Sequence, residues 1–144
     1  MDNAVDSLRK LHTALIDTER GYQEALKDAG DPAVAALFTA MIELRRKDHA
    51  ELHQALTRLG DTPDESGSFM AAVHRTVVDV RARLTGLNES ALGSFVSGEE
   101  SVIGLYDSAL EAAVGDPDLR DLLNRQKAAL HGQIERMKSV QQAA

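Results

Sequence analysis

The 144-residue chain has no cysteine and no tryptophan, and it has only three prolines, three phenylalanines and two tyrosines. Without cysteine it can form no disulfide, iron–sulfur cluster or thiolate zinc site, and it has no cysteine nucleophile. Any bound metal would therefore need carboxylate or imidazole ligands. Because aromatic residues are few, the core must consist mainly of aliphatic side chains.

Positive charge is also scarce. Lys and Arg total 16 against 23 Asp and Glu, which gives a formal charge of −7, and the basic residues are scattered. A scattered pattern offers no basic stripe for phosphates, so we expect no nucleic-acid partner. No apolar run approaches membrane-spanning length, and the first six residues have neither a basic nor an apolar signal region. We therefore expect a cytoplasmic protein without membrane insertion.

Between the few glycines and prolines, apolar residues recur at helical spacing, which predicts an all-α fold. The chain length favours one domain over residues 1–144. Asp31-Pro32 and Asp116-Pro117 are typical of a helix N-cap followed by the first helical residue. The predicted helices cover 4–28, 32–59, 68–84, 88–114 and 117–141.

The two halves of the sequence resemble each other. Tyr22 before Asp31-Pro32 is echoed by Tyr106 before Asp116-Pro117. This similarity predicts two helical hairpins joined by the shorter helix at 68–84. If that helix crosses back along the bundle, the result is a ferritin-like four-helix bundle with one crossover.

Polar residues interrupt the apolar stripe of each of the four long helices. At about 100° per residue, they fall among inward-facing apolar positions, and we expect Glu19 in particular to be largely buried. With a crossover, Glu19 and Glu99 lie about 16 Å from the same end of the bundle, close enough to share a partner. The others lie about a turn further along, so all five should converge near mid-bundle. These residues are Glu19, Arg45, Asp48, Glu99 and Gln126.

Two interpretations of this cluster remain open. In the favoured one, Arg45 neutralises the carboxylates in a Glu19–Arg45–Glu99 or Asp48–Arg45 network that binds nothing. In the other, residual negative charge binds one divalent iron, manganese or zinc ion through Glu19, Asp48 and Glu99. The side chains that would surround such an ion are Arg45, Glu51, Tyr22, Tyr106, Gln126 and His12.

The histidines give a weaker signal. His49 and His53 have the i,i+4 spacing that can bind zinc, but the helical wheel places His53 outside and His49 at the margin, so we expect solvated surface residues. His12 lies at the edge of the buried stripe, two turns before Glu19, from where it could reach the cluster.

Several short motifs carry a resemblance to a known family. They are Asp17, Gly21-Tyr22 and Glu24-Ala25, then Arg45, Glu51-Leu52, Gly67-Ser68-Phe69 and His74-Arg75, and finally Leu84-Thr85-Gly86, Gly98-Glu99, Tyr106 and Arg125-Gln126. With these motifs the chain resembles a ferritin-like family of proteobacterial four-helix-bundle proteins of unestablished activity, distantly similar to rubrerythrin and ferritin bundles. The resemblance implies the bundle and no reaction, and it suggests a role in stress physiology by analogy.

Di-iron bundles need one Glu from each of two helices and a Glu-x-x-His from each of the other two. Glu19 and Glu99 fit the lone glutamates, but Glu-x-x-His occurs nowhere in the chain. We therefore expect no catalytic residues and a non-catalytic or weakly metal-binding bundle. The alternatives are a ferritin-like oxidoreductase acting on ferrous iron or peroxide, and an interaction module that binds another protein or forms a homodimer.

Overall fold

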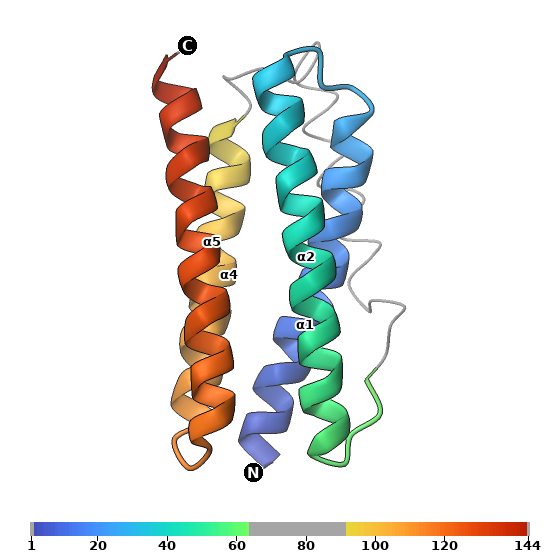
Figure 1. Cartoon of the computed structure of the whole chain (residues 1–144), viewed down its shortest axis with the longest axis vertical. Helices are drawn as coiled ribbons and strands as arrows, with labels where there is room; N and C mark the ends of the chain where they lie inside the picture. The colour runs from blue at the N-terminus through green and yellow to red at the C-terminus, as the bar shows by residue number, and fades with distance from the viewer. Residues whose placement is uncertain (1, 64–91, 144) are drawn as a thin grey trace.

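A computed structural model of the chain describes residues 2–63 and 92–143 and shows four helices there (Figure 1). They confirm the four long predicted segments, and every described boundary lies within two residues of its expected position. The helix predicted at 68–84, and the predicted start of the next helix at 88–91, lie outside the described residues. The helices are α1 (Asp2–Leu26), α2 (Pro32–Arg58), α4 (Leu92–Ala112) and α5 (Pro117–Ala143).

The four helices pack side by side with their axes nearly aligned (Figure 1). α1 packs against α2 and α4, and α5 packs against the same two helices. α2 and α4 both begin at the end of the bundle where α1 finishes, so α2 ends at one end and α4 begins at the other (Figure 1). These directions are the ones expected for two hairpins joined by a crossover.

The turns follow from local chemistry. The Asp31 side chain caps α2 by accepting hydrogen bonds from the backbone N–H groups of Ala33 (2.7 Å) and Val34 (3.4 Å). Asp116 caps α5 in the same way, because its carboxylate accepts from the backbone N–H of Leu119 (3.1 Å). Both predicted N-caps are thus confirmed.

The end of α2 depends on Gly60, which has a φ of 85°. In this left-handed conformation, which favours glycine, the N–H of Gly60 reaches the carbonyl of Thr57, and the N–H of Asp61 reaches that of Leu56. This is the Schellman arrangement, which satisfies carbonyl groups left over at a helix end. Asp61 then accepts hydrogen bonds from Arg9 of α1 and so ties the two helix ends together.

The Asp31 cap gives a direct test of this local account. We expect Asp31→Ala to lower the free energy of unfolding by about 1 kcal/mol, because two helix N–H groups lose their acceptor. Glu43→Ala, on the exposed face of the same helix, should change it by less than about 0.5 kcal/mol. Urea unfolding monitored by circular dichroism measures both. Equal effects would show that the cap contributes nothing beyond loss of a surface charge.

In the part of the chain that the structure describes, the core is mostly aliphatic and contains one small cluster of Tyr and Phe rings. Tyr22, Phe38 and Phe95 bring their ring centroids within 4.7–5.5 Å of one another, joining α1, α2 and α4. None of the described helices is long and apolar enough to cross a membrane.

Candidate functional site

Among the residues that the structure describes, six polar or charged ones in the interior of the bundle are at most 2% exposed. Four of them were predicted to face inward: two on α2, one on α4 and one on α5, which are Arg45, Asp48, Glu99 and Gln126. The six are His12, Asp17, Arg45, Asp48, Glu99 and Gln126.

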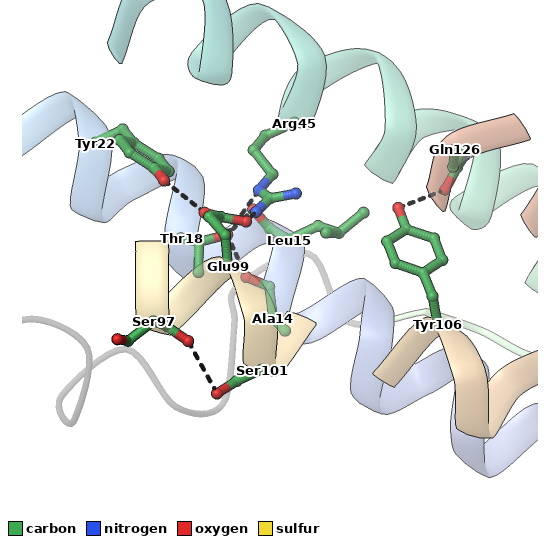
Figure 2. A network of polar contacts seen from close by, with 10 residues as sticks. All are labelled: Ala14, Leu15, Thr18, Tyr22, Arg45, Ser97, Glu99, Ser101, Tyr106 and Gln126. Carbon is green, nitrogen blue, oxygen red and sulfur yellow. Dashed lines mark hydrogen bonds and ion pairs between the residues drawn. The ribbon is translucent and has the colours of Figure 1, made fainter. Parts of the chain in front are cut away.

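The centre of the site is the ion pair between Arg45 and Glu99, which joins α2 to α4 (Figure 2). The Nη2 group of Arg45 donates to Oε1 of Glu99, and the Tyr22 hydroxyl on α1 donates to Oε2 at 2.5 Å. Nε of Arg45 donates to the Thr18 hydroxyl oxygen at 3.0 Å. The Thr18 hydroxyl in turn donates to the Ala14 carbonyl at 2.7 Å. Three helices are therefore joined through one fully buried guanidinium.

Beyond Arg45, a second group of polar residues joins α2, α4 and α5. The Tyr106 hydroxyl donates to Oε1 of Gln126 at 2.9 Å (Figure 2). Nε2 of Gln126 donates to the backbone carbonyl of Asp48 (3.2 Å) and to Oε1 of Glu51 (3.0 Å). Arg125 donates to Glu51 from the solvent side (3.2 Å). Both donor hydrogens of the Gln126 amide are thus in use.

Asp48 is the unusual member of this group. Its side chain is fully buried, yet within the described part of the chain no hydrogen-bond donor reaches either carboxylate oxygen. Burial raises the pKa of Asp48 to about 6, although the nearby positive charge of Arg45 opposes the shift. Near neutral pH the site can therefore gain or lose a proton.

Burial affects the other ionisable groups in predictable directions. It raises the pKa of Tyr22 and of Tyr106, so both phenols keep the proton that they donate. It lowers the pKa of Arg45. Although burial alone would raise the pKa of Glu51, hydrogen bonds from Gln126 and Arg125 hold it below its ordinary value.

Glu19 is largely buried, as expected, but it does not join the central network. Its side chain is 14% exposed and lies at the seam between α1 and α2, where it accepts from Nε of Arg46 at 3.3 Å. Nδ1 of His49 lies 3.4 Å from its other oxygen. Arg45 and Arg46 point about 100° apart on α2 and contact different glutamates. Glu19 and Glu99 therefore do not share a partner.

The histidines also lie differently from the prediction. His12 is 1% exposed, deeper than an edge position, and its ring centroid lies 5.8 Å from that of His49 and 6.1 Å from that of His53. His49 and His53 are both partly buried, so His49 holds the marginal position expected for it, whereas His53 is less exposed than expected. The three imidazoles form a cluster between α1 and α2 near Glu19, separate from the Arg45–Glu99 contact.

The structure does not bring the proposed metal ligands together. Glu19 faces the seam, Glu99 is hydrogen-bonded to Arg45 and Tyr22, and Asp48 lies nearer Tyr106 and Gln126. Across residues 2–63 and 92–143, no three His, Asp or Glu side chains are placed to hold one metal ion. Metal binding through Glu19, Asp48 and Glu99 thus remains a prediction without geometric support.

Thr18 is a member of the network that the sequence reasoning missed. It follows Leu8, Leu11 and Leu15 at alternating steps of three and four, and Tyr22 continues the series. That strict spacing picks out Thr18, one residue before Glu19, as the inward position. Asp17, buried on the same helix, was noted only as part of a family motif.

A groove of about 460 Å³ lies on the surface between α2 and α5. It is open to solvent and carries charges of both signs. The charged side chains lining it are Glu51, Arg58, Asp118 and Arg125. Glu51 therefore connects this groove to Gln126 and the buried group.

Residues 3–112, which cover α2, α4 and all but the first residue of α1, match the family described as "Domain of unknown function (DUF2383)". No curated protein and no solved structure matches the chain. The match covers most of the sequence and includes Thr18, Tyr22, Arg45 and Glu99, the four side chains of the central network. The chain therefore belongs to this family of domains of unknown function.

Proposed function

We propose that the chain is a non-catalytic, ferritin-like helical bundle in which Arg45 neutralises a carboxylate of the kind that metal-dependent bundles present to a metal ion. One observation carries this proposal. Each oxygen of Glu99 accepts a hydrogen bond, one from the Arg45 guanidinium and the other from the Tyr22 hydroxyl. A guanidinium in contact with a carboxylate opposes binding of a divalent cation there.

Such a bundle would act through a partner protein or a second copy of itself rather than through a reaction. The order of helix directions supports the ferritin-like topology. The role in stress physiology rests on the sequence resemblance alone.

The rival function is binding of a single metal ion, with ferrous iron or peroxide chemistry as its extension. The buried, donor-free carboxylate of Asp48 favours this rival, because such a group needs a cation, a proton or a water molecule. Glu51, one turn further along α2, is close enough to influence the pKa of Asp48. Its carboxylate is already held by Gln126 and Arg125, however, which weakens the rival.

Metal analysis separates the two functions. Chain purified without chelator should contain well below about one equivalent of metal, and added Fe(II), Mn(II) or Zn(II) should leave its melting temperature unchanged. The result that would overturn our proposal is about one equivalent of metal that Glu99→Ala abolishes and Glu100→Ala retains. Glu100 is the matched control because it is the exposed neighbour of Glu99 on α4.

A further inference from the structure

Two side chains one turn apart on α2 are left with unused hydrogen-bonding groups in the core. Arg45 and Asp48 are both 0% exposed. Nη1 of Arg45 and both carboxylate oxygens of Asp48 have no hydrogen-bond partner among the described residues. Buried polar groups are nearly always paired with protein or with ordered water, so this coincidence needs an explanation.

The unused donor and the unused acceptors face the same part of the core. In Figure 2, one guanidinium nitrogen of Arg45 carries no dashed line and points toward the side where Tyr106 and Gln126 lie. Asp48 lies on that side, since its backbone carbonyl accepts from Gln126 and its charge affects the pKa of Tyr106. Arg45 and Asp48 also influence each other's pKa, although no ion pair joins them.

Neighbouring side chains cannot supply what Asp48 lacks. The Tyr106 hydroxyl has one hydrogen, and it goes to Gln126. The Gln126 amide has two, and they go to the Asp48 backbone and to Glu51. Lys47 and Arg125 also act on the charge of Asp48, but neither donates a hydrogen bond to it. Nη1 of Arg45 is the buried donor without a partner among the described residues, and it makes no direct hydrogen bond to Asp48.

We propose that an internal water molecule occupies this position, accepting a hydrogen bond from Nη1 of Arg45 and donating one to the carboxylate of Asp48. Water suits the site because it both accepts and donates, as the two unused groups require. A metal ion does not suit it, because the guanidinium would direct N–H hydrogens and positive charge at the ion. Gln126 donates to the Asp48 backbone and to Glu51, which lines the open groove between α2 and α5, so polar groups connect this part of the core to the surface.

A crystal structure of the native chain, at about 2 Å resolution or better, tests this proposal. We expect one ordered water within about 2.7–3.2 Å of both Nη1 of Arg45 and a carboxylate oxygen of Asp48. A direct hydrogen bond between the two side chains would overturn it. The proposal would also be overturned if Arg45 and Asp48 packed together with no water between them. It would equally be overturned by a density with metal-like distances near 2.1 Å and an anomalous signal.

Solution NMR provides a second readout that does not depend on crystals. The Arg45 side-chain N–H signals of the native chain should show a cross-peak to a long-lived water, and Asp48→Asn should keep it because the amide retains an acceptor oxygen. Asp48→Leu should abolish that cross-peak. Asp121→Leu, at an exposed position on α5, is the control for apolar substitution and should leave it in place. A cross-peak that survives Asp48→Leu unchanged would show that Asp48 does not hold the water.

Discussion

Replacing Arg45 with methionine should lower the free energy of unfolding by about 3–5 kcal/mol. Methionine fills much of the volume of the arginine stem but removes the positive charge that compensates Glu99. The Glu99 carboxylate, 2% exposed, would then keep only the Tyr22 hydroxyl as a donor. Asp48 would lose its nearby positive charge as well. Urea unfolding near neutral pH, monitored by circular dichroism, measures the loss.

The next residue provides the control. Arg46 is 61% exposed in its side chain and contacts Glu19 at the surface, so Arg46→Met should cost less than about 1 kcal/mol. Adding Glu99→Leu to Arg45→Met should recover a large part of the stability, because no buried charge is then left alone. If Arg45→Met and Arg46→Met had the same effect, Arg45 would not be the buried centre of the bundle.

Much of the fold could be predicted because the helix boundaries are set by capping residues close to them in the sequence. Asp31, Asp116 and Gly60 are recognisable from sequence alone, since their roles depend on neighbouring backbone groups rather than on distant contacts. The inward positions of Arg45, Asp48 and Glu99 could be predicted for the same reason: helical periodicity fixes a direction relative to nearby apolar residues.

The partners of those residues were harder to predict. Successive residues on a helix differ by about 100°, so an error of one position changes which neighbouring side chains a residue contacts. That error exchanged Thr18 for Glu19 on α1. The packing of α1 and α4 against α2 decides which N–H groups of the Arg45 guanidinium form hydrogen bonds and which one has no partner among the described residues. Spacing along one helix does not contain that information.

The histidine cluster shows the same limit. The i,i+4 spacing of His49 and His53 is visible in the sequence, but the helical wheel of α2 places them toward the surface. Their ring contacts with His12 arise because α1 packs along that side of α2. A pattern read one helix at a time cannot show which neighbour will cover a marginal position.

Replacing Asp48 with asparagine should make the stability difference from wild type depend on pH. The pKa of Asp48 is about 6 in the folded chain, against about 3.9 for an unfolded aspartate. Below about pH 4 both states hold the proton, and the group has no net effect. Between about pH 4 and pH 6 the folded state binds more protons, so the free energy of unfolding falls as pH rises. Above about pH 6 Asp48 is ionised in both states, and its burial lowers the free energy of unfolding by up to about 3 kcal/mol.

Asparagine is never charged, so Asp48→Asn removes this penalty while keeping the size of the side chain. The stability of the variant relative to wild type should therefore rise by about 2–3 kcal/mol between about pH 4 and pH 8, whatever its value at the acid end. Comparing the two proteins cancels the carboxylates that they share, including Glu51, whose lowered pKa acts in the opposite direction. Asp121→Asn, at an exposed position on α5, is the matched control for exchanging a carboxylate for an amide. A pH-independent difference for Asp48→Asn would mean that the folded chain holds Asp48 ionised as readily as water does. In that case the hydration around Arg45 and Asp48 would have to compensate fully for burial.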